Sequence, residues 1–442
     1  MLKRLMQRLR GQPRPPKLKL QIIPRDRHSL SRQHISSAAK KVLYGLQEAG
    51  FQAYLVGGSV RDLLLGLQPK DFDVATNATP EEVRNIFRSS RIIGRRFRLV
   101  HVMFGRETVE VATFRAHHQD DTGQGATNAT GMIVRDNVYG SIEQDAERRD
   151  FTVNALYYHI ADFSIHDFAG GFADIERRTL RLIGHPETRY REDPVRMLRA
   201  VRFAAKLQFT LDPACAEPIP HLATLLSSVS PHRLFDEVQK LLACGHATQI
   251  LDMLENLRLL PVLFPSLHAN DASMTLIRAT ARSTDERIAV GKSINPAFFY
   301  AALLWQSVQD RQCQLHDHGS PVMPAWQQAS QYVLQKQSER TALTKFTGMA
   351  IREIWEMQPR LQVPDVRQLD GLLSSPRFRA AFDFLVLREA SGEKTGHMGA
   401  WWERYQHADP GLQAEMTRAL VDQKATATPN RRKRRPRKRK PT

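Results

Sequence analysis

The sequence predicts an α+β protein, with a mixed β-sheet in an N-terminal head and helices throughout the remainder. Strand-length apolar runs bounded by glycine and polar turns occur between about residues 52 and 168. From about residue 187 to 420, apolar residues recur with the spacing of helices. The chain closes on RRKRRPRKRK at 431–440, whose like charges repel and can bury little, so we expect disorder after Val421.

Local signals place the elements of the head. Gly50 closes a helical pattern that begins at Ser31. Thr79-Pro80-Glu81-Glu82 combines a capping threonine, a proline at the first helical position and a glutamate three residues after the cap. The other expected elements are a strand at 52–56, a helix over 59–66, a strand at 71–76, a hairpin of strands at 98–104 and 108–114, a mobile polar loop at 115–135 and strand-like segments within 151–168.

The charge balance points to a polyanionic partner. Lys and Arg number 64 against 46 Asp and Glu, a formal net charge of +18. Nine of the basic residues lie in the run at 431–440, so half of the excess is spread over the rest of the chain. Such a surface favours polyanions, because each phosphate that it neutralises releases condensed counterions.

Cysteine usage and hydropathy indicate the compartment. Cys215, Cys244 and Cys313 are widely spaced and odd in number, and no CxxC occurs, so a reducing compartment is the simpler interpretation. No apolar stretch is long enough to span a bilayer. We therefore expect a cytoplasmic protein without stable membrane insertion, and a monomer.

The main chemical signal is the pair Asp71-Phe72-Asp73. Strand side chains alternate between faces, so both carboxylates are expected on one face while Phe72 points into a core. Two adjacent carboxylates repel unless a cation lies between them, and two divalent ions about 3.5–4 Å apart can clamp an in-line phosphoryl displacement. Mg²⁺ suits one or two carboxylates plus substrate phosphates. In isolation, such a pair is typical of an exposed turn.

The segment upstream of the acidic pair changes that interpretation. Gly57 and Gly58 lie between a predicted strand and a predicted helix, where backbone N–H groups can approach a triphosphate. Ser59 adds a hydroxyl or amide donor, and Arg61 follows in the first turn. A phosphate-binding turn and an acidic pair fourteen residues apart together indicate a nucleotide site.

Four segments carry a resemblance to a known family: GGSVRDLLLG, KDFDVAT, RRDFTVNALYY and EDPVRMLRAVRFAAKL, in this order and spacing. They resemble the class II nucleotidyltransferases, which contain the tRNA CCA-adding enzymes and the bacterial poly(A) polymerases. Within that family the chain looks most like the poly(A) polymerases, because of IGRRFRLVHVMFG at 93–105, VEVATFR at 109–115 and the basic tail. The resemblance implies a polymerase-β-like nucleotidyltransferase head.

The resemblance also implies roles for individual residues. Asp71 and Asp73 match the two metal-binding acids, and Asp150 matches a third catalytic acid. Glu110 is a rival for that third role, because alternation in VEVATF can turn it toward the acidic pair. The residues that match the ATP-binding positions are Gly57, Gly58, Ser59, Arg61, Arg149, Asp193, Arg196, Arg199 and Arg202.

Base selection is expected on a helix that begins near Glu192. Asp193 and Arg196 are three residues apart and would share a face, so a carboxylate and a guanidinium would meet the N6 amino group and N1 of adenine. A surface ion pair is the structural alternative. Phe203 is expected in the core. RNA phosphates are expected to contact the tail residues Arg431, Arg432, Lys433, Arg434 and Arg435.

The resulting expectation is template-independent polyadenylation of RNA 3′ ends, with ATP as substrate and two Mg²⁺ ions, or Mn²⁺ in their place, as cofactors. The alternatives are a tRNA CCA-adding enzyme and a catalytically inactive RNA-binding relative. RNA-decay proteins are the expected protein partners. The expected segments are a basic flexible segment at 1–30, a catalytic head at 31–185, a nucleotide-selecting neck at 186–270, a helical RNA-binding body at 271–420 and a disordered tail at 421–442.

Overall fold

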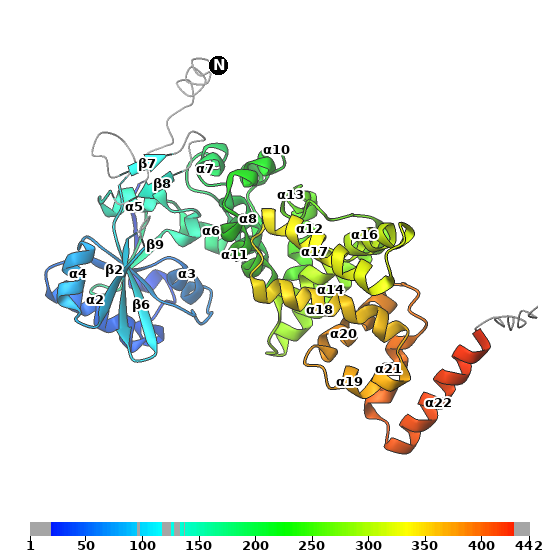
Figure 1. The fold of residues 1–442 in the computed structure, drawn as a ribbon. Helices are drawn as coiled ribbons and strands as arrows, with labels where there is room; N and C mark the ends of the chain where they lie inside the picture. The colour runs from blue at the N-terminus through cyan, green and yellow to red at the C-terminus, as the bar shows by residue number, and fades with distance from the viewer. Residues whose placement is uncertain (1–18, 95–97, 117–124, 128–132, 137, 428–442) are drawn as a thin grey trace, which may run out of the picture. The chain divides into compact units, whose positions relative to one another are not determined.

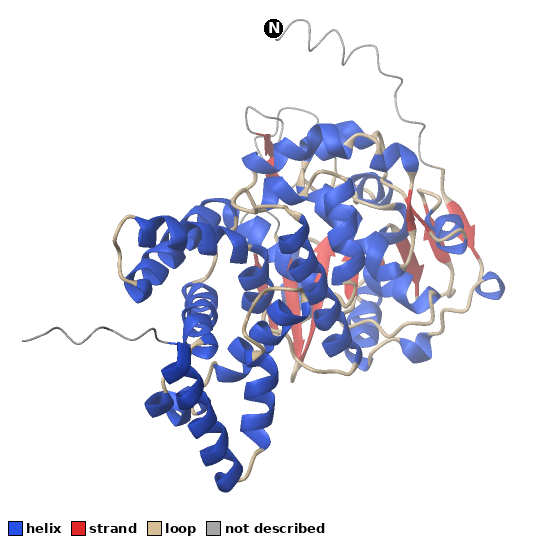
Figure 2. Cartoon of the chain, turned by 90° about the vertical axis from the view of Figure 1, so that its right-hand side faces the viewer, coloured by secondary structure: helices blue, strands red, loops and turns tan. Residues whose placement is uncertain are grey.

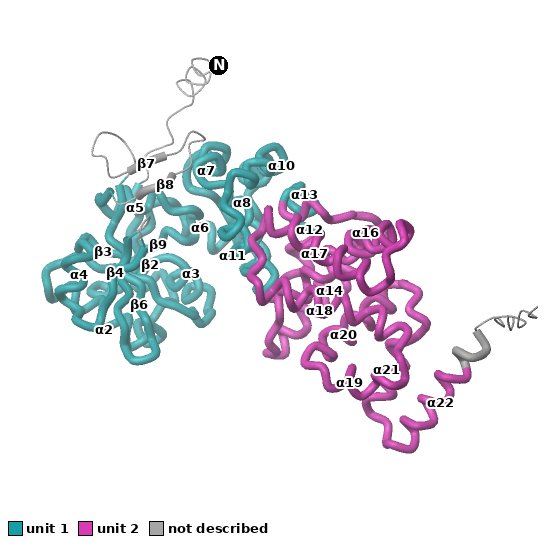
Figure 3. The backbone as a smooth tube through the Cα atoms, in the orientation of Figure 1, with its two compact units in different colours: residues 1–244, 252–262 teal, residues 245–251, 263–442 magenta. Residues whose placement is uncertain are grey.

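A computed structural model describes residues 19–94, 98–116, 125–127, 133–136 and 138–427 (Figure 1). It confirms the α+β prediction. The chain forms two compact units, one of residues 1–244 with 252–262 and the other of residues 245–251 with 263–442 (Figure 3). The first unit therefore joins the expected head to most of the expected neck, and the second holds the remaining helices.

One eight-stranded sheet organises the head. Its order is β1-β10-β9-β2-β3-β6-β5-β4, and every neighbouring pair is antiparallel except β3 and β6. The predicted hairpin is confirmed as β5 and β6. The strands are β1 Gln21–Ile23, β2 Ala53–Val56, β3 Asp73–Thr76, β4 Ser90–Ile93, β5 Leu99–Phe104, β6 Glu107–Thr113, β9 Leu156–His159 and β10 Ile165–Asp167.

Two predicted loops contain strands instead. The lead-in expected up to residue 30 supplies β1, which pairs with β10 and buries Ile23. The expected loop at 115–135 contains β7 (Gly125–Thr127) and β8 (Ile133–Asp136), which pair with each other. Strands of three or four residues show too little alternation to be found in the sequence, because distant pairing partners define them. A further small pair joins β11 (Thr179–Leu180) to β12 (Thr210–Leu211).

Helices cover the sheet. In α2 (Ser37–Glu48), the Ser36 hydroxyl caps the helix start, and the helix packs against β2, β3 and β6. The predicted start of α4 (Pro80–Ile86) is confirmed, with Thr79 and Glu82 forming a capping box. The helix α5 (Ile142–Arg148) packs its Ile142 and Ala146 against Tyr54, Val56, Ala75 and Tyr157. Because strand side chains alternate, Asp73 shares the face of Ala75 that α5 covers.

Besides α2, α4 and α5, the first unit contains one helix between two strands of the sheet and several helices that follow the sheet in the chain. The longest of them, α8, buries Ala200 and Phe203 as predicted and packs against α11. These helices are α3 Gly58–Leu64, α6 Gly171–Glu176, α7 Pro186–Glu192, α8 Val195–Leu207, α9 Pro213–Ala216, α10 Ile219–Leu222 and α11 Pro231–Leu242. The residues of two more helices, α12 Ala247–Asn256 and α13 Leu260–Leu263, are divided between the two units.

The described part of the second unit is helical, and all the strands of the described residues belong to the first unit. Figure 2 draws the helices in blue and the strands in red. Trp355 and Trp402 are fully buried in this unit. The helices are α14 Asp271–Ala289, α15 Pro296–Leu303, α16 Trp305–Asp317, α17 Val322–Arg340, α18 Lys345–Gln362, α19 Leu369–Leu373, α20 Phe378–Ala390, α21 Met398–His407 and α22 Pro410–Ala427. The last helix thus continues beyond Val421, where disorder was expected.

Two general features bear on the expected compartment. All three cysteines are free thiols, and Cys215 is buried. None of the described helices combines the length and the apolar composition that a bilayer crossing requires.

Candidate active site

The acidic pair lies where β2 ends and β3 begins. Val56, the last residue of β2, is paired with Asp73, the first residue of β3. The predicted strand thus begins two residues late, and Asp71 occupies an exposed bend before it. The expectation that strand alternation orients Asp71 is therefore wrong, because Asp71 is not paired in the sheet. Phe72 is only partly buried.

The glycine turn faces Asp73. Gly57 adopts a positive φ of 77°, a region that L side chains rarely enter. A Cβ at this position would lie 3.5 Å from Arg149 Nη1 and 3.9 Å from Asp73 Oδ2. The turn, the acid and the guanidinium therefore converge on one point. The Ser59 hydroxyl donates to the Val56 carbonyl at 3.0 Å, which leaves its amide as the remaining donor.

Glu110 is the closest carboxylate neighbour of Asp73 in the sheet. β3 and β6 are parallel, and Asp73 is directly paired with Glu110, so the two side chains share a face. Burial raises the pKa of Asp73 to about 6, and the charges of Glu110 and Asp71 add to this effect while Arg149 opposes it. On β5, His101 Nε2 lies 3.6 Å from Glu110 Oε2.

This acidic cluster fits a divalent cation by its chemistry. Among the described residues, no group of three or more His, Cys, Asp or Glu side chains is already arranged around a common metal position. Asp73 nevertheless has two acidic neighbours whose repulsion a cation would relieve. Carboxylate oxygens are the donors that Mg²⁺ prefers. Asp71, Asp73 and Glu110 are therefore the side chains that could hold one.

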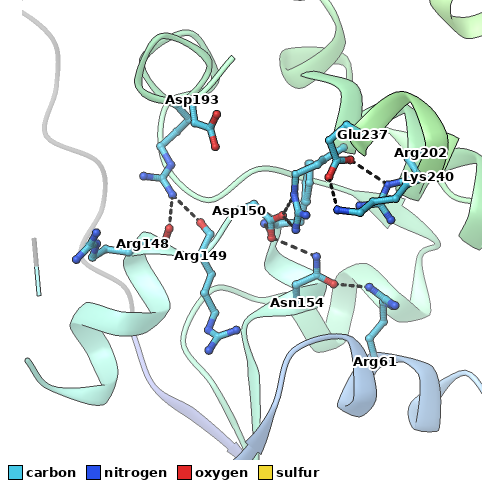
Figure 4. A network of polar contacts seen from close by, with 12 residues as sticks. Arg61, Arg148, Arg149, Asp150, Asn154, Asp193, Arg202, Glu237 and Lys240 are labelled. Atoms are coloured by element: carbon cyan, nitrogen blue, oxygen red, sulfur yellow. Dashed lines mark hydrogen bonds and ion pairs between the residues drawn. The ribbon is translucent and has the colours of Figure 1, made fainter. Parts of the chain in front are cut away.

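Asp150 lies in a different environment from these acids. Its Oδ2 accepts hydrogen bonds from Arg199 Nε at 2.8 Å and Nη2 at 2.5 Å. Its Oδ1 accepts from Asn154 Nδ2 at 3.2 Å (Figure 4). Burial alone would raise the pKa of Asp150, but the ion pair with Arg199 outweighs it and holds the pKa well below the usual range. Asp150 and Arg199 belong to two separate sequence motifs, and the structure brings them together.

Asn154 extends this arrangement to Arg61. The Asn154 Oδ1 accepts a hydrogen bond from Arg61 Nη1 at 2.5 Å (Figure 4). Arg61, Asn154, Asp150 and Arg199 therefore form a continuous chain of polar contacts. Arg61 is only 3% exposed, and its Nε also donates to Asp62 at 2.8 Å. Its Nη2 would lie 3.4 Å from a Cβ at Gly58. The guanidinium is therefore packed beneath the glycine turn rather than extended into solvent.

Asp193 and Arg196, expected on one helical face, lie on different elements. Asp193 lies between α7 and α8 and its Oδ2 accepts from Arg233 Nη2 of α11 at 2.6 Å. Arg196 donates instead to the Arg189 carbonyl at 2.8 Å and to Glu192 at 3.1 Å. The chain turns between the two helices, so Asp193 is not on the helical face that carries Arg196.

Arg202 completes a set of cations around one aromatic ring. The guanidinium carbons of Arg61, Arg199 and Arg202 lie 5.2, 5.2 and 4.4 Å from the centroid of Phe203. Glu237 of α11 approaches Arg202 Nε at 3.4 Å and accepts a hydrogen bond from Lys240 (Figure 4). The tail residues Arg431, Arg432, Lys433, Arg434 and Arg435 lie outside the described residues.

Known proteins match this chain over most of its length. A family model described as "Poly A polymerase head domain" matches residues 53–181. Two others, "Probable RNA and SrmB- binding site of polymerase A" and "Polymerase A arginine-rich C-terminus", match residues 208–271 and 318–440. The chain is 46% identical to Poly(A) polymerase I of Salmonella typhimurium over 432 residues, which cover 95% of this chain and 92% of that protein. The chain belongs to the poly(A) polymerase family.

In sequence, CCA-adding enzymes match a smaller part of this chain, although one of their solved structures matches most of it. The CCA-adding enzyme of Bacillus subtilis is 40% identical over 221 residues, which cover 50% of this chain and 54% of that protein. The solved structure of the Bacillus stearothermophilus CCA-adding enzyme in complex with CTP matches with a TM-score of 0.52 and 26% identity, over 87% of this chain and 82% of that one.

Sequence reasoning missed several polar partners in this member of the poly(A) polymerase family. Asn154, Tyr157 and Asp145 lie in or near the RRDFTVNALYY segment but received no role, and Arg233 and Glu237 on α11 received none either. The signal for the first group was available, since a buried asparagine or tyrosine must find a hydrogen-bond partner. No sequence signal links α11 to α8.

Proposed function

We propose that this chain adds adenosines to RNA 3′ ends without a template, transferring AMP from ATP and releasing pyrophosphate. The observation that carries the proposal is the 46% identity to Poly(A) polymerase I over 95% of the chain. The CCA-adding enzymes, by contrast, match about half of it. The three free cysteines support a place in the reducing cytoplasm.

The geometry around Gly57 supports a site for the triphosphate. Backbone amides of Gly57, Gly58 and Ser59 would bind phosphate oxygens, and Arg149 would contribute a guanidinium beside them. Arg61, held under Gly58, would support the turn and add positive charge. Two Mg²⁺ ions, or Mn²⁺ in their place, would neutralise charge that develops at the reacting phosphate. Asp71 and Asp73 would hold them.

The residues further along α8 would orient the base and the RNA. Asp193, held by Arg233, and Arg196 would meet the adenine edge, while Arg199 and Arg202 would meet ribose or phosphate. The tail residues 431–440 would hold RNA by its phosphates, with little dependence on sequence. The protein mainly positions reactants and neutralises charge, as phosphoryl transfer requires.

For the third acidic role, the register of β3 and β6 favours Glu110 over Asp150. We expect Glu110→Gln to lower kcat on the order of 100-fold, the size of losing one preorganised electrostatic group, without lowering the free energy of unfolding. Asp150→Asn should instead lower that free energy by roughly 1–3 kcal/mol, because it weakens a buried ion pair. Full activity in the Glu110 variant, with activity lost in a stable Asp150 variant, would return the role to Asp150.

A nucleotide panel tests the overall function. The purified protein is incubated with an oligo(A) primer, Mg²⁺ and each of the four nucleoside triphosphates separately, and a second set replaces the primer with tRNA lacking its CCA end. Long products from ATP on both RNAs, with little CTP incorporation, are the expected result. CTP incorporation into the tRNA would identify a CCA-adding enzyme. No incorporation in any reaction would identify an inactive relative.

A further inference from the structure

Two buried side chains fix the guanidinium of Arg149. Its Nε donates to Asp145 Oδ2 at 3.1 Å and to the Tyr157 hydroxyl at 2.9 Å, and its Nη2 lies 3.1 Å from the same Asp145 oxygen. The Tyr157 hydroxyl in turn donates to Asp145 Oδ2 at 2.7 Å. Arg149, Asp145 and Tyr157 therefore form a closed set of polar contacts, which we call the Arg149 clamp.

The clamp leaves one nitrogen of Arg149 for another partner. Within the described residues, Nη1 makes no hydrogen bond, and it is the atom that would lie 3.5 Å from a Cβ at Gly57. Only a glycine at this position leaves room for a ligand between the turn and the guanidinium. A guanidinium whose other nitrogens are occupied presents Nη1 in one fixed direction.

The surroundings keep the clamp rigid and charged. The Tyr157 ring is fully buried and packs edge-on against Tyr54 and Phe168, with centroid distances of 6.2 and 5.8 Å. Burial alone would lower the pKa of Arg149, but Tyr157 and Asp145 outweigh it and raise the pKa, so the side chain stays cationic. A second contact comes from Asp145 Oδ1, which accepts the Arg115 backbone N–H at 3.2 Å.

We propose that Tyr157 and Asp145 are positioning residues that hold Arg149 Nη1 at the Gly57 turn, where it meets the triphosphate of the incoming nucleotide. The inference rests on the proposed function, because it assumes that the turn binds a nucleoside triphosphate. Tyr157 and Asp145 would thus increase the affinity for the nucleotide without touching it. Pre-organisation of this kind improves binding because the side chain needs no ordering when the ligand arrives.

Tyr157→Phe is the decisive variant, because it keeps the packed ring and removes one hydroxyl. The matched control is Tyr158→Phe at the next position of β9, whose hydroxyl is buried and makes no hydrogen bond in the described structure. For both variants, ATP affinity is measured by calorimetry in the presence of Mg²⁺, and KM and kcat are measured on an oligo(A) primer. Thermal unfolding establishes that each variant is folded.

We expect Tyr157→Phe to raise the Kd and KM for ATP by about 10- to 150-fold, as for loss of a hydrogen bond to a charged group. The KM for the primer and the value of kcat should change less than about twofold, and Tyr158→Phe should match the wild type. Arg149→Lys should also weaken ATP binding, since the single ammonium group of lysine cannot contact Asp145 and Tyr157 and the nucleotide through separate nitrogens. Combining it with Tyr157→Phe should then cost no more than Arg149→Lys alone.

Two results would overturn the inference: wild-type ATP affinity in Tyr157→Phe, or additive losses in the double variant. Calorimetry separates this failure from that of the proposed function. A wild-type protein that binds ATP but does not extend RNA rejects the polymerase activity and still lets the clamp be judged by affinity. A wild-type protein that does not bind ATP rejects both.

Discussion

Asp73 shows how a single carboxylate can reduce the stability of the ligand-free fold. It is partly buried at the start of β3, beside Glu110, and burial followed by the field of that neighbour raises its pKa to about 6. Its proton is therefore held more tightly in the folded chain than in the unfolded chain. The resulting stabilisation is complete below about pH 3.8 and is lost as the pH rises through about 6.

Replacing this acid should therefore stabilise the metal-free protein. We expect Asp73→Asn to raise the free energy of unfolding by about 1–3 kcal/mol at pH 8 in EDTA, since one pKa unit corresponds to about 1.4 kcal/mol. The gain should disappear near pH 4. Denaturant unfolding across this pH range measures it.

The exposed Asp71→Asn serves as the matched control, with an expected change below about 0.5 kcal/mol. Added Mg²⁺ should stabilise the wild type and not Asp73→Asn. Equal stabilities of wild type and Asp73→Asn at pH 8 would contradict the assigned burial and charge repulsion.

At the scale of elements, α11 contacts the turn between α7 and α8. The spacing of apolar residues in the sequence does not indicate this contact. Arg233 of α11 holds Asp193 at 2.6 Å, while Arg196 is occupied by Glu192 and the Arg189 carbonyl. A carboxylate held by a neighbouring helix keeps one orientation. The helix α11 therefore contributes to how Asp193 is presented, although it carries no motif of its own.

Removing that ion pair should affect nucleotide choice. We expect Arg233→Ala to reduce the preference for ATP over CTP roughly tenfold, which corresponds to about 1.4 kcal/mol. The measurement is kcat/KM for each nucleotide on one primer. Arg191→Ala, which removes an exposed ion pair with Glu187 on α7, is the control and should leave the preference unchanged. Equal preferences in Arg233→Ala and the wild type would show that Asp193 needs no support from α11.

At the scale of the whole molecule, charge is the property that concerns RNA. The formal net charge of +18 is divided between the run at 431–440 and the rest of the chain. Binding that rests on phosphate contacts weakens with salt in proportion to the number of phosphates neutralised. The two sources of charge can therefore be separated by experiment.

A chain that ends at Ala427 lacks nine basic residues of the tail. We expect the plot of log affinity for oligo(A) against log salt to become shallower by about 0.7 for each phosphate that the shortened chain no longer neutralises, while the KM for ATP stays unchanged. Fluorescence anisotropy of a labelled primer measures the slope. A full-length variant with the nine residues replaced by glutamine separates charge from length and should behave like the shortened chain. An unchanged slope would place the RNA-binding surface elsewhere.

The sequence alone was sufficient for the order of most elements of the head, although not for β1, β7 and β8, and for placing Gly57 near Asp73. Gly57, Asp73 and the hairpin at β5 and β6 follow from local rules: a strained turn needs glycine, strands alternate, and apolar runs need partners. The family could also be inferred from four motifs, and the comparison over the full chain bears this out. These features depend on residues close together in the chain.

Only the tertiary structure decided which charges are paired. The parallel register of β3 and β6 places Glu110 beside Asp73. Asp150 forms an ion pair with Arg199, and Asp193 forms one with Arg233. The tertiary structure also recruits β1 to the far edge of the sheet. Each of these contacts joins segments distant in sequence. Because a charged group in a partly buried site takes whichever partner the packed elements bring within reach, spacing along the chain does not determine its choice.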